Sequence, residues 1–258
     1  MLKFSTNLSL LFNEVPLLER FKVARQQGFQ AVEVQFPYTL SAESLRACLD
    51  EQQLTLVLFN VDADDLLDGG EGLASVPEKQ EQFRHAVAQA VAYAKVLKPE
   101  FINVLPGRCF NEYRRQAYLK TFKDNLLFAV EAFAPLGIKT VFEAINDQDM
   151  PGFMINHGVQ MLDILDELRL PSLFMQYDIY HLTKMGDDIV GFISQNADRI
   201  GHIQFADCPG RGQPGTGDID FENLFSVIKQ SSYSGWVGAE YKPIGSSLDS
   251  LNWFNSVF

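Results

Sequence analysis

The sequence predicts an α/β fold, a single (β/α)8 (TIM) barrel that spans residues 1–258 as one domain. Short apolar runs rich in β-branched and aromatic residues alternate with longer segments of helical period, which is typical of βαβ units and a parallel sheet. Eight such pairs fit into 258 residues, and a barrel of this kind usually takes about 250. No linker rich in Pro, Gly or Ser divides the chain. A doubly wound open sheet is the alternative architecture.

The short apolar runs are the expected strands, and a segment of helical period follows each of them. The expected strands are Lys3–Leu8, Ala31–Phe36, Thr55–Asn60, Phe101–Leu105, Lys139–Glu143, Leu173–Asp178, His202–Ala206 and Trp236–Glu240. The expected helices are Pro16–Gln27, Ser41–Gln52, Glu78–Leu97, Tyr113–Pro135, Gly158–Leu168, Asp188–Asn196, Phe221–Lys229 and Ser247–Trp253.

Start and stop signals support several of these helices. Ser75 and Glu78 have the spacing of a capping box, in which each side chain bonds the backbone at the other position. Asp220 can cap the seventh helix, because its carboxylate accepts from N–H groups that the first turn leaves unpaired. Gly28 and Gly137 follow two helices where a left-handed residue ends the helix.

Composition and charge exclude several classes of protein. The chain is 47% hydrophobic, which is ordinary for a globular protein with a sizeable core. Its formal charge of -12 would repel nucleic acid, and its densest group of cations suits a solvated helix face. That group is Arg114, Arg115, Lys120 and Lys123. No apolar run approaches the roughly 20 residues of a membrane span, so we expect neither nucleic acid nor membrane as a partner.

The three cysteines bear on the compartment. Cys48, Cys109 and Cys208 lie far apart and form no CxxC pair, which favours neither a disulfide framework nor a zinc cluster. Polar residues interrupt the first segment before a signal-peptide core develops. We therefore expect a cytoplasmic protein.

Four polar residues stand at or near the carboxyl ends of successive apolar strands. They are Glu143, Asp178, Gln204 and Glu240. Because the strand ends of a parallel barrel face a common mouth, these side chains should converge. Three carboxylates there would repel one another unless one is protonated or a cation lies between them. The oxygen donors favour Mg²⁺ or Mn²⁺ over zinc. The alternative is that each carboxylate caps a helix or pairs with a nearby side chain.

Two histidines lie near these strand ends. His181 follows Asp178 by three residues, so we expect it in the same mouth, where it contacts a substrate oxygen or a metal ligand. His202 lies two residues before Gln204, on the same face but one layer deeper. We expect His202 to be a buried core histidine.

The segment Gly210–Gly215 matches the pattern GxGxxG, but it is not expected to bind a dinucleotide. That fingerprint requires the glycines to open a helix directly after a strand, and Pro214 keeps this segment irregular. We expect a flexible loop that covers the barrel mouth. Arg211 in this loop is a candidate to bind a substrate carboxylate.

Five stretches of the chain resemble the hydroxypyruvate isomerase family, within the larger xylose isomerase-like group of metal-dependent barrels. They run in order from the first strand to the last helix as FSTNLSLLF, EAINDQDMPGF, QYDIYH, GHIQFADCPGRGQPGTGDID and GWVGAEYKP. The resemblance implies an aldose–ketose type isomerase that interconverts hydroxypyruvate and 2-hydroxy-3-oxopropanoate (tartronate semialdehyde). Its partner would be a small 2-oxo hydroxy acid.

The resemblance also implies roles for individual residues. Glu143 and Glu240 match two glutamates that perform the proton transfers. The metal ligands of the larger group match Glu143, Asp178 and Glu240, and Gln204 stands where many relatives have a His ligand. Asp149 falls where relatives carry an acidic substrate contact.

The expected mechanism passes through an enediolate that a divalent ion stabilises, with one glutamate as base and the other as acid. Arg211 and Lys242 are the candidates for the substrate carboxylate, and His181 for a hydroxyl or carbonyl oxygen. Alternatives are a 2-oxo-tetronate isomerase, a ketose 3-epimerase, a DNA-repair endonuclease, and a non-catalytic metal- or sugar-binding barrel. Trp253 and Phe254 suit a subunit contact of a homo-oligomer, and equally a helix packed on the barrel.

Overall fold

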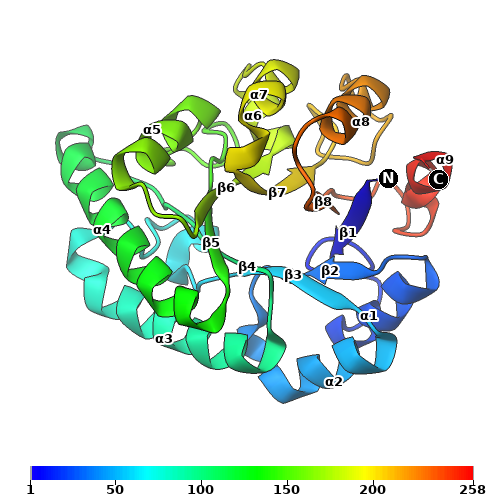
Figure 1. The fold of residues 1–258 in the computed structure, drawn as a ribbon, viewed down its shortest axis with the longest axis horizontal. Coiled ribbons are helices and arrows are strands. Elements are labelled where there is room, and N and C mark those ends of the chain that lie inside the picture. The colour runs from blue at the N-terminus through cyan, green and yellow to red at the C-terminus, as the bar shows by residue number, and fades with distance from the viewer. Residues whose placement is uncertain (1, 258) are drawn as a thin grey trace.

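A computed structural model describes residues 2–257, and the side chains of residues 2–254. Eight parallel strands close into a barrel in chain order, with β1 beside both β2 and β8, and the helices surround it (Figure 1). The strands are β1 (Lys3–Asn7), β2 (Ala31–Glu33), β3 (Thr55–Asn60), β4 (Phe101–Val104), β5 (Lys139–Glu143), β6 (Leu173–Asp178), β7 (Ile200–Phe205) and β8 (Trp236–Ala239). The predicted (β/α)8 barrel is confirmed.

The helices follow the strands in the predicted alternation, with one addition. They are α1 (Leu17–Gln26), α2 (Ala42–Gln52), α3 (Gln80–Leu97), α4 (Arg115–Phe133), α5 (Gly158–Leu168), α6 (Ile179–Lys184), α7 (Ile189–Asn196), α8 (Phe221–Gln230) and α9 (Asn252–Val257). The addition is α6, which begins directly at the end of β6. Short 3-10 turns precede or end several helices, as at Glu112–Arg114 and Ala134–Leu136.

The predicted capping box is wrong. Pro77 opens a 3-10 turn, so α3 begins only at Gln80, beyond the reach of the Ser75 side chain. Among the described side chains, the Ser75 hydroxyl is buried without a hydrogen-bond partner. Glu78 instead pairs with Arg114 on the neighbouring turn.

The other predicted helix ends are confirmed. The Asp220 carboxylate accepts from the backbone N–H of Asn223 at 3.0 Å, and so caps α8. Gly28 and Gly137 have φ values of +95° and +73°, in the left-handed region that glycine adopts at little cost.

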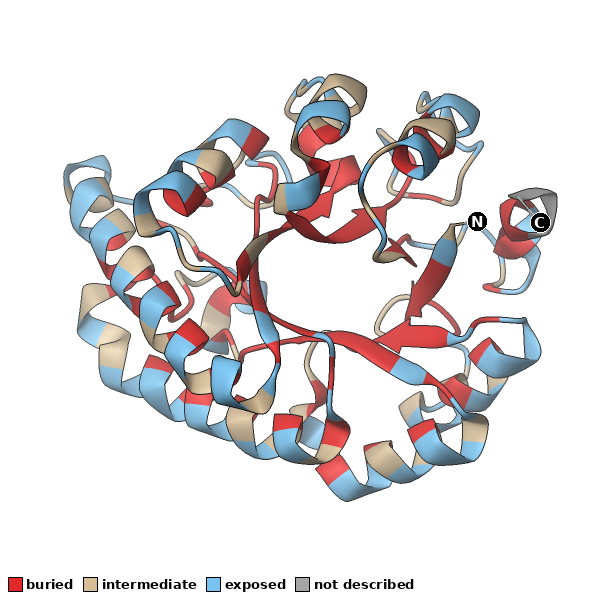
Figure 2. Cartoon of the chain, viewed as in Figure 1, coloured by how far each residue is buried: buried red, intermediate tan, exposed pale blue. Residues whose placement is uncertain are grey.

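The core lies in two layers, inside the barrel and between the barrel and its helices. Figure 2 shows strands buried along most of their length and helices buried on their inner faces. In α9, Phe254 stacks on Phe29 with ring centroids 4.4 Å apart, and Trp253 meets Phe4 edge-on at 5.3 Å. Both side chains are buried, which agrees with the second of the two alternatives, a helix packed on the barrel.

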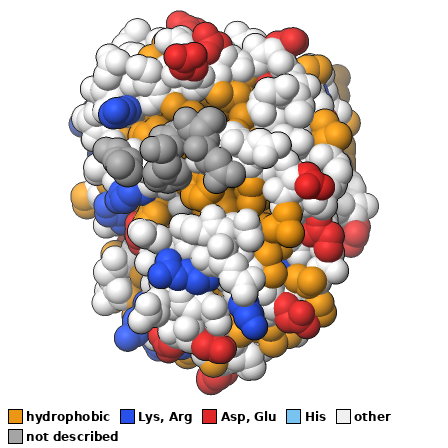
Figure 3. Space-filling view, turned by 90° about the vertical axis from the view of Figure 1, so that its right-hand side faces the viewer, with side chains coloured by type: hydrophobic (Ala, Val, Ile, Leu, Met, Phe, Trp, Pro, Cys, Tyr) orange, Lys and Arg blue, Asp and Glu red, His pale blue; other side chains and the backbone are white. Residues whose placement is uncertain are grey.

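Charged side chains on the surface are mixed in sign. Arg114, Arg115, Lys120 and Lys123 each form an ion pair with an acidic side chain. The face shown in Figure 3 carries scattered cations among acidic and apolar side chains, with no continuous basic stripe. Within residues 2–257, no helix is both long enough and apolar enough to cross a membrane.

Candidate active site

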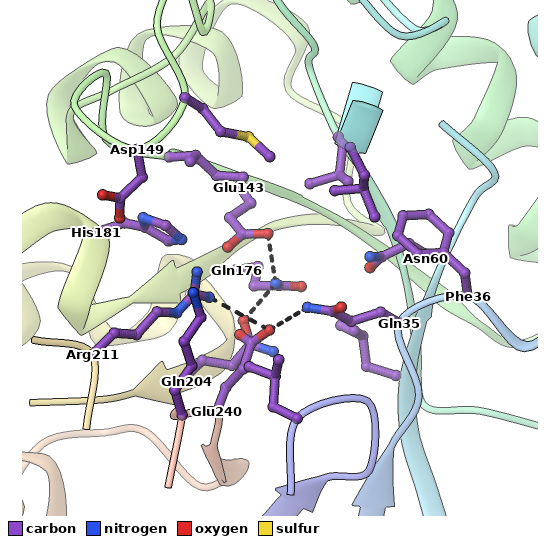
Figure 4. Close-up of a pocket in the computed structure, with 17 residues that line it drawn as sticks. Gln35, Phe36, Asn60, Glu143, Asp149, Gln176, His181, Gln204, Arg211 and Glu240 are labelled. Atoms are coloured by element: carbon purple, nitrogen blue, oxygen red, sulfur yellow. Dashed lines mark hydrogen bonds and ion pairs between the residues drawn. The ribbon is translucent and has the colours of Figure 1, made fainter. Parts of the chain in front are cut away.

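A pocket of about 280 Å³ opens at the carboxyl ends of the strands (Figure 4). It brings together seven of the eight predicted site residues, from four different strand ends or the segments that follow them. They are Glu143, Asp149, His181, Gln204, Arg211, Glu240 and Lys242. The eighth, Asp178, lies buried beside His181. The convergence expected from the order of the strands is therefore what the barrel produces.

Two glutamates face each other across this pocket. The Glu143 side chain ends β5, and its Oε2 accepts hydrogen bonds from Gln176 at 2.9 Å and Asn103 at 3.2 Å. Glu240 follows β8, and its Oε1 accepts from the Gln35 amide at 2.5 Å. Neutral amides therefore orient both carboxylates without cancelling their charge.

Burial makes ionisation of these glutamates costly. It raises the pKa of Glu143 well above the usual range, and the nearby carboxylates of Glu240 and Asp178 raise it further. Burial likewise raises the pKa of Glu240 to about 8, against the opposing effect of the Arg211 guanidinium. A buried carboxyl with a pKa near neutrality is suited to take up and return protons.

The two carboxylate oxygens of Asp178 make different contacts. Its Oδ1 caps α6, accepting from the backbone N–H groups of Tyr180 at 2.8 Å and His181 at 3.3 Å. Its Oδ2 faces the site, 3.6 Å from His181 Nε2 and 4.0 Å from Arg211 Nη2. The alternative that this carboxylate caps a helix thus holds for one oxygen and leaves the other for the site.

A buried group of three side chains could bind a metal ion. Glu143, Asp178 and His181 each offer a ligand atom, and these atoms lie within 4.8 Å of one another. A divalent cation there would relieve the repulsion that raises the pKa of Glu143, so the donor set fits such an ion. The Gln204 oxygen also lines the pocket and accepts from Gln176 at 2.6 Å.

His181 is a neutral imidazole in this setting. Burial lowers the pKa of His181 to about 4, although the Asp178 carboxylate opposes that shift. Its ring Nδ1 lies 2.6 Å from the Asn146 side-chain nitrogen. The ring therefore adds no positive charge to the carboxylates.

Arg211 supplies the cation nearest both Asp178 and Glu240. Its guanidinium lies over the Tyr180 ring at 5.2 Å, with Nη2 3.8 Å from Glu240 and 4.0 Å from Asp178. Both distances exceed a hydrogen bond, and its buried Nε is without an acceptor in the described part of the chain. Donors of the guanidinium thus remain available to an anionic ligand.

The loop that carries Arg211 is held by one aspartate. Asp207 Oδ2 accepts from the backbone N–H groups of Gly215, Thr216 and Gly217 at 2.8 to 2.9 Å. Its Oδ1 accepts from two further backbone N–H groups. The glycines of this segment therefore form irregular turns before α8, in agreement with the prediction that they open no helix. We expected a flexible loop, but these hydrogen bonds to Asp207 hold the segment in place.

Lys242 and Asp149 occupy the rim in different ways. The Lys242 side chain is exposed, while its backbone N–H donates to the Arg211 carbonyl at 2.7 Å and so ties the two loops together. The Asp149 carboxylate accepts from Lys184 at 2.6 Å and Tyr180 at 2.7 Å. These donors hold the pKa of Asp149 far below its usual range despite partial burial.

Several residues around the site were not predicted, among them Glu33. It is fully buried in the barrel and accepts from Ser5 at 2.6 Å, His202 at 2.8 Å and Gln204 at 2.7 Å. His202 is thus the buried core histidine that the sequence predicts. The sequence feature that could have identified Glu33 as a site residue is that it is a lone acidic residue inside an apolar strand. Gly238 leaves the necessary space, since a Cβ there would lie 2.1 Å from the Glu33 carboxylate.

The family model of the xylose isomerase-like TIM barrel matches residues 21–257. The chain belongs to this family. Among curated relatives, hydroxypyruvate isomerase of Escherichia coli is 40% identical over 99% of both chains. The 2-oxo-tetronate isomerase of Cupriavidus necator is 36% identical over 97% of this chain and 96% of that protein.

A solved structure from Brucella melitensis, described as an AP endonuclease of family 2, superposes with a TM-score of 0.95. It is 35% identical and covers 99% of both chains. The predicted resemblance to hydroxypyruvate isomerases of the xylose isomerase-like family is therefore confirmed, as is the prediction of an isomerase.

Proposed function

We propose that this protein interconverts hydroxypyruvate and 2-hydroxy-3-oxopropanoate. The observation that carries the proposal is the pair of buried glutamates, Glu143 and Glu240, on one pocket that also holds the Arg211 guanidinium. The 40% identical relative from Escherichia coli is named hydroxypyruvate isomerase, which supports the same substrate. A base and an acid on one substrate are what a proton shift between adjacent carbons needs.

In the reaction, C3 of hydroxypyruvate loses a carbon-bound proton and C2 gains one through an enediolate, while the hydroxyl proton passes from the C3 oxygen to the C2 oxygen, so no external oxidant or reductant is needed. Arg211 binds the substrate carboxylate, and the exposed ammonium of Lys242 adds positive charge at the entrance. One of Glu143 and Glu240 removes the C3 proton, the other delivers a proton to C2, and proton exchange with solvent then restores both side chains. His181 and Asp149 contact substrate oxygens on the same wall of the pocket.

The proposed cofactor is a divalent ion, Mg²⁺ or Mn²⁺, held by Glu143, Asp178, Gln204 and Glu240. When bound, such an ion supplies Lewis-acid stabilisation of the negative charge that develops on the substrate oxygens. The oxygen donors of this set favour a hard ion over zinc. The surrounding amides of Gln176 and Asn103 keep the Glu143 carboxylate oriented in either case.

Proton NMR of hydroxypyruvate in D₂O tests the proposal. We expect the aldehyde product and solvent deuterium in the substrate with Mg²⁺ present, and loss of both signals after chelation. No turnover and no deuterium exchange would contradict the proposed substrate. Turnover that survives chelation would contradict the proposed metal.

A 2-oxo-tetronate isomerase is the second candidate, because the relative of that name from Cupriavidus necator is 36% identical over nearly the full chain. Its substrate is one carbon longer and needs the same pair of proton-transfer groups. Comparing kcat/KM for three-carbon and four-carbon 2-oxo acids separates the two. Failure of both acids to exchange deuterium would favour a non-catalytic binding barrel.

A further inference from the structure

The His181 ring presents its two nitrogens to different surroundings. Nδ1 points to Asn146 in the loop after β5, where both residues are buried. Nε2 faces Asp178 at 3.6 Å, on the side of the pocket that His181 lines. The position of the single proton on a neutral ring decides whether Nε2 donates a hydrogen bond or offers a lone pair.

The orientation of the Asn146 amide is fixed by its neighbours. Its Oδ1 accepts from the backbone N–H of Asp149 at 2.8 Å, and a backbone N–H can only donate. The other amide atom is therefore the nitrogen, which lies 3.0 Å from Asp149 Oδ2 and 2.6 Å from His181 Nδ1. A flipped amide would place its oxygen against the Asp149 carboxylate and its nitrogen against an N–H.

Two N–H groups of Asn146 thus converge on one ring nitrogen. The side-chain nitrogen lies 2.6 Å from Nδ1, and the backbone nitrogen lies 3.5 Å from it. A proton on Nδ1 would point at the hydrogens of both donors, so Nδ1 must accept a hydrogen bond from them. This geometry excludes the Nδ1–H tautomer and also the imidazolium, and leaves the ring proton on Nε2.

We infer that Asn146 is a positioning residue that holds His181 as the Nε2–H tautomer, so that the ring donates a hydrogen bond to a substrate oxygen. The inference rests on the proposed function for the nature of that oxygen. A donor that is already aligned stabilises the charge of the enediolate without reorganisation. Because a proton occupies the Nε2 lone pair, the ring can donate to a substrate oxygen but cannot coordinate a metal ion. The oxygen ligands alone would then hold the metal.

The decisive measurement is the ring tautomer in protein labelled with ¹⁵N-histidine, observed at pH 7 without substrate. Long-range ¹H–¹⁵N correlations distinguish protonated from unprotonated ring nitrogens, and the H181Q spectrum assigns the signals of His181. We expect protonated Nε2 and unprotonated Nδ1, unchanged when Mg²⁺ is added. A proton on Nδ1, or loss of the Nε2 proton on adding Mg²⁺, would overturn the inference.

The variant N146D places a carboxylate oxygen beside Nδ1 and should move the ring proton there or protonate both nitrogens. The matched control is N111D, since Asn111 caps an exposed turn by accepting from the Tyr113 N–H, which aspartate also does. The control should leave the His181 signals of the wild type. An unchanged tautomer in folded N146D would contradict the inference.

Kinetics then separate positioning from simple loss of structure. Loss of one aligned donor costs about 10²- to 10³-fold in kcat in well-studied sites, and we expect a fall of at least about 10-fold in N146D with a smaller change in KM. In an H181A background, N146D should cost nothing further. An equal additional loss there would show that Asn146 acts by another route. Because the tautomer is read without substrate, failure of the proposed substrate leaves this test intact.

Discussion

Glu143 and Glu240 hold their carboxylates in a place where neither ionises easily. Replacing either with glutamine keeps the size and the hydrogen-bonding capacity but removes the group that takes or returns a proton. We expect E143Q and E240Q each to lower kcat for the isomerisation by roughly 10²- to 10⁴-fold. Initial rates with hydroxypyruvate and circular dichroism melts would measure activity and folding in parallel.

The matched control for these variants is E131Q, because Glu131 lies exposed on α4 and does not line the pocket. It should keep the wild-type rate. A folded E143Q or E240Q with near-normal turnover would remove that residue from the proton transfers.

Arg211 presents a planar fork of donors to the pocket, with its Nε still without an acceptor among the described residues. Lysine keeps the charge but loses the two parallel hydrogen bonds to a carboxylate. We therefore expect R211K to raise KM for the substrate about 10-fold or more, with a smaller effect on kcat. R199K, at an exposed ion pair with Asp166, is the control and should change neither value. An unchanged KM in R211K would place the substrate carboxylate elsewhere.

Residues at strand ends were predictable because chain order alone brings strand ends to one mouth. The sequence did not predict the roles of Asn146, Gln176 and Glu33, because each role depends on the direction in which an amide or carboxylate points. That direction depends on donors from other strands, as when Gln176 bonds Glu143 and Gln204 together. Spacing in the sequence carries no information about such contacts.

At the scale of elements, the loop after β7 depends on Asp207. Its two oxygens accept from five backbone N–H groups, and an asparagine there would turn an NH₂ toward some of them. We expect D207N to loosen the loop and so raise KM several-fold through Arg211. Hydrogen exchange in residues 207–219 should become faster.

The control for this loop is D220N, because asparagine caps a helix about as well as aspartate. D220N should keep the wild-type exchange rates and KM. If D207N exchanged as slowly as wild type, the carboxylate would not be the anchor of the loop.

The elements that periodicity predicted are those long enough to show a period. The six residues of α6 are too few for that, and its signal was Asp178, a capping residue directly before it. The failed capping box at Ser75 shows the opposite case, in which the pattern is present but Pro77 starts a tighter turn first. Local signals therefore compete, and the backbone geometry between them decides.

At the scale of the whole molecule, closing the barrel forces three carboxylates into one buried mouth, and the cost should appear in the stability of the metal-free protein. The pKa of Glu240 is about 8 in the folded chain and 4.5 in an exposed one. Between these values the folded state holds a proton that the unfolded state has released, so stability falls as pH rises. Glu143, whose pKa burial also raises, adds to the same trend.

His181 opposes this trend at lower pH. The pKa of His181 is about 4 when folded and 6.5 when exposed, so below about pH 6.5 the unfolded state takes up a proton on His181, which offsets part of the gain in stability from Glu240 and Glu143. With EDTA present, we expect the melting temperature to fall by a few degrees per pH unit between pH 6.5 and 8. E240Q should flatten that slope, and Mg²⁺ at pH 8 should raise the melting temperature because it binds only the folded chain. A melting temperature that rises from pH 6.5 to 8 without metal would show that the carboxylates are paired in some other way.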